Sequence, residues 1–191
     1  VSREKALQDT TRIVPAGTNS WTRGNVTRTA EEVFLTPLQT IVRIRTVYSD
    51  VSRENFWPEN LSYLAYSGSG TPQSTFSARI AASITYEDGV IEKAEPGEYD
   101  FDRQDFAHAV YETVEVVALP PVTDSDSMVL KVYEIDDITC AITHIADYSI
   151  NLTSQTMQID EQNVLVYDPE TGAMADEYKT YLKWRYGMDV G

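Results

Sequence analysis

Residues 138–150 alternate between apolar and polar side chains without a glycine or a proline to interrupt them. Successive side chains of a β-strand point to opposite faces, so this segment has one mainly apolar face and one mainly polar face. The pattern is typical of a long strand in an antiparallel sheet that has one face on a core and the other toward water. The apolar face consists of Ile138, Cys140, Ile142, His144, Ala146, Tyr148 and Ile150.

A second segment, residues 75–86, alternates in the same way and lacks the three- and four-residue spacing of a helix. The Asp-Gly pair that follows it at residues 88 and 89 is a hairpin signal. The two alternating segments predict a shared core in which Ile80, Ile84 and Ile142 are buried.

Shorter alternating or β-branched runs punctuated by turn residues predict the remaining strands, and residues 136–137 predict a tight hairpin. Residues 174–186 fit either a helix or a strand, and their aromatic content favours the strand. About eight strands at this spacing indicate an all-β domain over residues 36–191, a single β-sandwich of the jelly-roll kind. The shorter strands are expected at residues 38–48, 61–66, 111–119, 128–135, 156–159 and 164–167.

Residues 1–35 have little apolar periodicity, and Pro15, Gly17 and Gly24 interrupt any longer pattern. We expect them to form an extended basic arm that gains order only against a partner surface. The first 45 residues carry a net charge of +3, whereas the remainder carries −18. A positive arm on a negative body suits contact with a neighbouring copy or with an anionic membrane surface.

The whole chain has 191 residues, a length that suits one domain, and a net charge of −15 with only five lysines. High acidity with few lysines favours a protein that works in concentrated salt, although an ordinary acidic protein also fits. No apolar leader is visible at the amino terminus, and no run of about eighteen apolar residues predicts a membrane span.

The sequence contains no pattern that names a reaction. The two histidines, His108 and His144, have no second histidine at metal-ligand spacing, and His144 is expected to be a hydrogen-bonded core residue. Cys140 lies on the predicted apolar face, which indicates a buried, inert thiol. Phosphate-binding loops and the nucleophile-elbow motif are missing. We therefore expect no catalytic residues, no cofactor, no small-molecule substrate and no enzymatic activity.

Acidic clusters are the remaining candidates for a site. Asp100, Asp102 and Asp105 have a spacing that can hold calcium, but they lack the glycine and terminal glutamate of an EF-hand loop. A solvated loop is the simpler interpretation, so no metal site is predicted. The basic arm is too weakly charged to indicate specific nucleic-acid binding beside such an acidic body.

In size, acidity, strand pattern and the missing signal peptide, the chain resembles the small single-jelly-roll major capsid proteins of membrane-containing icosahedral viruses of halophilic archaea. The resemblance implies a structural subunit made in the host cytoplasm and located in the virion. Such a subunit forms capsomers by self-association and with a related capsid subunit, above an internal membrane.

Two other functions remain open. The chain could be a tail or head-completion component of a tailed virus, which also assembles. It could instead be a carbohydrate-binding or hydrolytic β-sandwich, for which solvent-exposed aromatic residues on one sheet face would be the sign. Trp57 and Trp184 are the first candidates for such residues.

Overall fold

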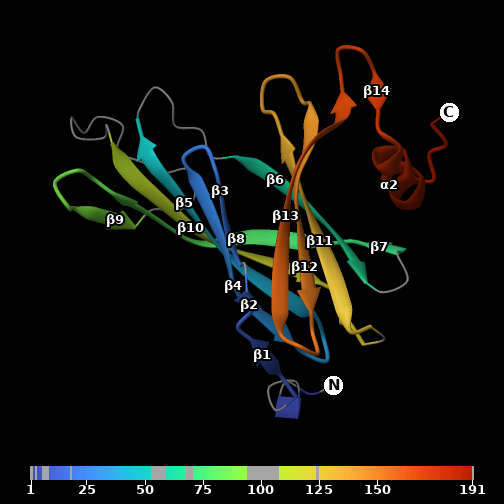
Figure 1. Cartoon of the computed structure of the whole chain (residues 1–191), viewed down its shortest axis with the longest axis horizontal. Helices are drawn as coiled ribbons and strands as arrows, with labels where there is room; N and C mark the ends of the chain where they lie inside the picture. The colour runs from blue at the N-terminus through green and yellow to red at the C-terminus, as the bar shows by residue number, and fades with distance from the viewer. Residues whose placement is uncertain are drawn as a thin grey trace. The chain divides into compact units, whose positions relative to one another are not determined.

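The computed structural model describes residues 2, 4–5, 9–17, 19–52, 59–67, 71–93, 108–123 and 125–190. Within these ranges the chain forms two antiparallel sheets and a carboxyl-terminal helix (Figure 1). The chain divides into two compact units, residues 1–58 with 76–121 and residues 59–75 with 122–191. The first unit contains the whole of one sheet, and the second unit contains the six strands that form the main path of the other.

The sheet of the first unit has the strand order β1-β4-β5-β10-β8-β9, and β3 pairs with β4. Its buried side chains follow the two-residue period of the sequence, as in β5, where Thr40, Val42, Ile44, Thr46 and Tyr48 are all buried. The strands are β1 (Thr11–Ile13), β3 (Ser20–Arg23), β4 (Val26–Leu35), β5 (Thr40–Val51), β8 (Phe76–Thr85), β9 (Ile91–Lys93) and β10 (Ala109–Leu119). The short β2 (Ala16–Gly17) follows β1 in the sequence but is not a strand of this sheet.

The sheet of the second unit has the strand order β14-β13-β12-β11-β6-β7. It is built on the long hairpin of β11 and β12, whose buried residues include Leu130, Val132, Tyr148 and Ile150. The strands are β6 (Asn60–Ser67), β7 (Thr71–Gln73), β11 (Ser127–Ile135), β12 (Ile142–Asn151), β13 (Thr156–Asp168) and β14 (Ala173–Met174), and the helix α2 (Asp176–Tyr186) follows.

These two sheets confirm the predicted all-β class and supply the two sheets that a β-sandwich requires. The hairpin at residues 86–90 is confirmed as well, since Tyr86 and Val90 are joined by a backbone hydrogen bond of 2.9 Å. Gly89 adopts φ = 83°, a left-handed conformation that glycine takes without a Cβ clash.

The strand predicted over residues 138–150 begins late, at Ile142, and the predicted tight hairpin is instead a loop of residues 136–141. The Asp136 side chain accepts hydrogen bonds from the amides of Ile138 (2.9 Å) and Thr139 (2.7 Å), which holds the chain in a turn. Cys140 has φ = 61° and is exposed, so the prediction of a buried thiol is wrong.

A bulge in β12 divides the face that the alternation predicts. Val132 pairs with Ala146 and Tyr133 pairs with His144, so Ile145 is left over between them. The phase of alternation changes at Ile145, which is itself fully buried. Ile142 and His144 therefore lie on one face of the sheet, whereas Ala146, Tyr148 and Ile150 lie on the other.

The core prediction is correct for Ile84, which is fully buried, but not for the other two isoleucines. Ile80 is 55% exposed because it occupies a bulge at which the pairing of β8 with β10 skips one residue. Ile142 is only partly buried, since it lies at the strand end before the β12 bulge.

Two predictions for the carboxyl-terminal region are also wrong. Residues 156–159 and 164–167 are not a pair of strands but parts of one strand, β13. Residues 176–186 form the helix α2, not a strand. Acidic residues occupy its first turn and basic residues its last, and Gly187 ends it at φ = 66° with an amide hydrogen bond to Lys183.

Residues 20–35 of the segment predicted as an arm form the β3–β4 hairpin of the first sheet. Their buried side chains include Trp21, Val26 and Val33. Arg28 is also fully buried and lies over the Trp21 ring at 5.1 Å, a cation–π contact. Among the described residues before this hairpin, Ile13 of β1 is fully buried beside β4.

Candidate functional site

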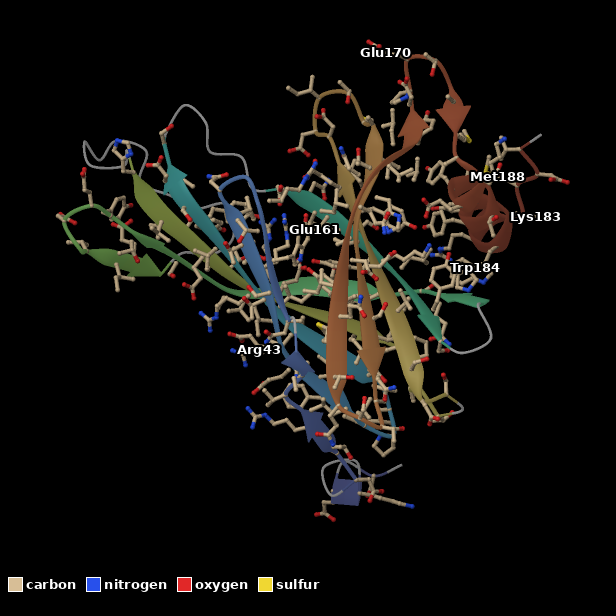
Figure 2. All side chains as sticks on the ribbon, in the orientation of Figure 1. Arg43, Glu161, Glu170, Lys183, Trp184 and Met188 are labelled. Carbon is tan, nitrogen blue, oxygen red and sulfur yellow. The ribbon has the colours of Figure 1, made fainter. Side chains whose placement is uncertain are left out.

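In the second unit, aromatic and titratable side chains gather where α2 lies against one face of the sheet (Figure 2). Glu177, in the first turn of α2, connects the helix to β11 and β12. It accepts a hydrogen bond from the Tyr133 hydroxyl (3.1 Å), and its carboxylate lies 3.5 Å from Lys131 Nζ and 3.4 Å from His144 Nδ1. One carboxylate thus joins the helix to three side chains of the sheet.

His144 is at the centre of this group and is only 4% exposed. Its Nε2 lies 2.6 Å from Asp147 Oδ1, and the bulge at Ile145 brings these two residues to the same face. Burial lowers the pKa of His144, but the hydrogen bond and charge of Asp147, together with the charge of Glu177, outweigh burial and raise it. The expectation of a hydrogen-bonded core histidine is confirmed.

The neighbouring phenols are held in their neutral form. Burial is the main reason that the pKa of Tyr133 is raised well above its usual range, and the nearby Glu177 carboxylate adds to it. Burial also raises the pKa of Tyr66, which lies under Lys131 at 5.2 Å. His144 is almost fully enclosed, and the contacts of Glu177 with Lys131, Tyr133 and His144 make this group an anchor that holds α2 to the sheet.

A cavity of about 190 Å³ lies beside the anchor, between α2 and the strands β6, β11 and β12. Aromatic side chains dominate its walls, and three of them project from the helix. Its lining consists of Ser62, Tyr63, Leu64, Tyr133, Ile135, Ile142, Tyr178, Tyr181 and Tyr186. We refer to it as the tyrosine pocket.

Aromatic stacking continues from the pocket along the helix. The Tyr178 ring stacks on Tyr167 of β13 at 5.5 Å and on Tyr181 at 6.1 Å between centroids. Tyr181 also contacts Trp184 and Tyr186, both of which are exposed. The spacing of these residues was visible in the sequence as a helical alternative, but their aromatic content favoured a strand.

The other sequence candidates lie apart from this group. His108 is exposed and forms a close ion pair with Asp50 in the first unit. Trp184 lies on α2 and not on a sheet face, whereas Trp57 and the cluster of Asp100, Asp102 and Asp105 fall outside the described residues. Within the described ranges, no three histidine, cysteine or carboxylate side chains are grouped as metal ligands.

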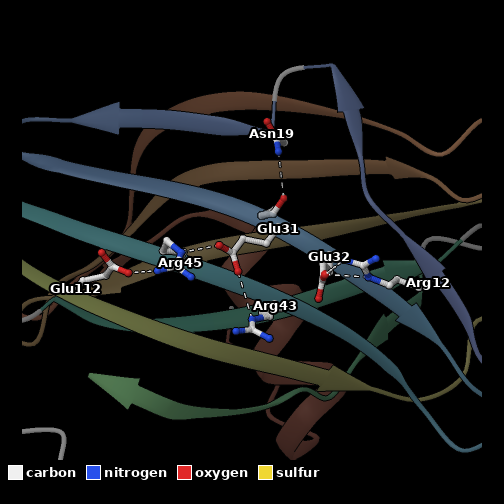
Figure 3. Close-up of polar contacts among 8 residues, drawn as sticks. Arg12, Asn19, Glu31, Glu32, Arg43, Arg45 and Glu112 are labelled. Carbon is white, nitrogen blue, oxygen red and sulfur yellow. Dashed lines mark hydrogen bonds and ion pairs between the residues drawn. The ribbon is translucent and has the colours of Figure 1, made fainter. Parts of the chain in front are cut away.

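The first unit has a network of ion pairs across β4, β5 and β10, shown in Figure 3. Glu31 lies 2.5 Å from Arg45 and 3.3 Å from Arg43, and Arg45 also pairs with Glu112. The four side chains are between 25% and 37% exposed, so water screens their charges and the network contributes only modest stability. Its ion pairs join neighbouring strands. A separate pair, Arg12 with Glu32, ties β1 to β4.

No family model, curated protein or solved structure matches this chain. In the part of the chain that the structure describes, no helix is long and apolar enough to cross a membrane.

Proposed function

We propose that this chain is a structural subunit that self-assembles into the capsomers of a virion. The observation that carries the proposal is the exposure of large apolar side chains along β8 and its neighbour β9. Phe76 is 70% exposed, and Ile80 and Ile91 are also more than half exposed. Apolar side chains displayed on strands in this way mark surfaces that a partner covers.

The pairing of β8 supports the same proposal. One side of β8 pairs with β10 along its length, but the other pairs with β9 only over residues 83–85 of the described chain. Residues 76–82 of the described sheet therefore lie at an edge on that side, and exposed edges readily add a strand from another molecule. Phe76 and Ile80 belong to this edge.

The charge distribution and the fold class agree with the viral assignment proposed here. A net charge of −15 suits a particle in concentrated salt, and two antiparallel sheets fit a capsid jelly roll. The proposal includes self-association, a related capsid subunit as partner, and contact of the basic amino-terminal segment with an anionic membrane surface. It also places the chain in the virion.

Substitutions at the β8 edge test the proposal. We expect Phe76→Asp and Ile80→Asp to reduce assembly measured by light scattering and electron microscopy, because each places a charge in an apolar contact. Thr85→Asp is the matched control, since Thr85 lies on β8 where β9 already pairs. Unchanged particles from both edge variants would contradict the role of this surface.

The tyrosine pocket favours a second candidate function, carbohydrate binding. Tyrosine rings in a cavity, with exposed Trp184 and Tyr186 beside it, resemble the platforms on which sugar rings stack. Ser62→Trp would fill the cavity from an exposed strand position. Under this alternative, a panel of oligosaccharides binds the wild type and not the variant in calorimetry.

A further inference from the structure

The loop of residues 136–141 presents an apolar side chain to solvent in a fixed conformation. Ile138 at its tip is 93% exposed. In addition to the two bonds to the Asp136 side chain, backbone hydrogen bonds of 2.9 Å run from the Cys140 amide to Asp136 and from the Asp136 amide to Ala141. Because the loop is ordered before any partner arrives, little conformational entropy is lost when Ile138 is buried.

The tyrosine pocket lies at the base of the same loop. Ile135 and Ile142 directly flank the loop, and both line the pocket opposite the tyrosines of α2. A volume of about 190 Å³ is ample for one aliphatic side chain. The end of the second unit thus carries an apolar projection and an apolar cavity side by side, and the projection does not occupy the cavity of its own chain.

Charges around the projection and the cavity are complementary. The loop and its approach carry Glu134, Asp136 and Asp137 and no basic residue. The helix beside the pocket has Asp176 and Glu177 in its first turn, but its later turns carry only basic charges, Lys179, Lys183 and Arg185. Figure 2 shows Lys183 on α2. In a protein of net charge −15, an acidic loop and the basic carboxyl-terminal part of α2 favour contact between copies in a defined orientation.

We propose that Ile138 of one copy enters the tyrosine pocket of a second copy, while the acidic residues of its loop face the basic residues of α2. Since the projection and the pocket are adjacent, a two-fold axis beside them allows both copies to make the contact reciprocally. This inference rests on the proposed function, because it supplies one of the subunit contacts that an assembling protein needs. It is separate from the β8 edge, which belongs to the first unit.

Two variants remove the two halves of the contact. Ile138→Asp places a charge at the projection, and Ser62→Trp fills the cavity. Both positions are exposed, so the fold of each variant should be retained and circular dichroism checks it. Leu38→Asp is the matched control, because Leu38 is an exposed aliphatic residue in the loop between β4 and β5, where its amide donates to Thr36 Oγ1.

Sedimentation equilibrium of each protein measures the dimer dissociation constant. We expect Ile138→Asp and Ser62→Trp each to raise it roughly a hundredfold or more, as the loss of two buried aliphatic contacts implies. Leu38→Asp should leave it unchanged. A dissociation constant that is unchanged in Ile138→Asp, or that rises equally in Leu38→Asp, overturns the inference. Loss of sugar binding in Ser62→Trp with unchanged dimerisation also overturns it and assigns the pocket to a ligand.

The outcomes separate this inference from the proposed function. Particles that form from Ile138→Asp as they do from the wild type contradict the contact and leave the capsid proposal standing. A wild type that stops at a dimer, which Ile138→Asp dissociates, confirms the contact and contradicts the capsid proposal. A wild type that is monomeric at every salt concentration contradicts both.

Discussion

Single residues decide which face of a strand reaches the core. Ile80 and Ile84 are four residues apart on β8 and would share a face in a regular strand, yet Ile84 is fully buried and Ile80 is exposed. The bulge at Ile80 accounts for the difference. The same residue type on the same strand therefore has two different roles.

We predict that Ile84→Ala lowers the free energy of unfolding by about 2–5 kcal/mol, because it loses buried methyl groups and leaves a cavity. Ile80→Ala should lower it by less than about 1 kcal/mol, since its side chain is already in water. Urea denaturation of the two variants provides the comparison. Equal losses would show that the bulge does not expose Ile80.

We predict a pH dependence of stability from His144. Its pKa is raised in the folded state, so the stabilisation from its charged form is complete below the unfolded pKa of about 6.5. That stabilisation disappears as the pH rises through the folded pKa. We expect the melting temperature to fall over this interval above pH 6.5, and His144→Asn to remove that part of the fall.

His108 is the control for this titration, because its hydrogen bond with the Asp50 carboxylate also raises its pKa. His108→Asn should leave the His144 part of the pH dependence intact. Melting curves of both variants across the pH range separate the two contributions. A pH dependence that persists unchanged in His144→Asn contradicts the anchor around this histidine.

At the scale of elements, one side chain of α2 makes several polar contacts that hold the helix to the sheet. Glu177 joins it to Lys131, Tyr133 and His144, whereas Asp176 in the same turn is exposed. We predict that Glu177→Gln destabilises the protein by about 1–3 kcal/mol, because the buried His144 and the partly buried Lys131 and Tyr133 lose a charged acceptor. Asp176→Asn should have an effect below about 1 kcal/mol, from the helix dipole alone.

Hydrogen exchange locates that effect. Amides of residues 176–186 should lose protection in Glu177→Gln and retain it in Asp176→Asn, since only the former releases the helix from the sheet. Equal protection in both variants would mean that the aromatic stacking of Tyr178 and Tyr181 holds α2 without the carboxylate.

The elements also show how far the sequence predicts the fold. The two-residue period identifies β5 and β8 and the buried face of residues 42–48, because each side chain there follows the strand regularly. It fails at Ile80 and Ile145, where bulges that depend on the neighbouring strand change the face. It also fails at Cys140, which the hydrogen bonds of Asp136 turn toward solvent.

The candidate site is less predictable than the strands. The sequence predicts His144 as a hydrogen-bonded core residue. It does not predict the contact with Glu177, because the aromatic content of residues 174–186 favours a strand there instead of the helix α2. The acidic start of α2, its basic end and Gly187 are ordinary helix signals that outweigh this preference. The tyrosine pocket requires the helix, so the sequence alone could not reveal it.

For the whole molecule, charge is the property that governs behaviour in solution. With 30 acidic and 15 basic residues, the folded chain repels itself in dilute buffer. We predict that the melting temperature rises as KCl increases from dilute to molar concentration, because salt screens this repulsion. A melting temperature that is flat or falls with KCl removes the argument for a protein adapted to concentrated salt.

Self-assembly is the central claim, and the mass of the isolated 191-residue chain in solution tests it most directly. Native mass spectrometry across a series of protein concentrations would measure that mass. The account predicts oligomers whose masses are integer multiples of the 21.5 kDa chain. The fraction of chains in these oligomers should increase as the protein concentration rises. A single species at 21.5 kDa at every concentration, confirmed by sedimentation in concentrated salt, would contradict it.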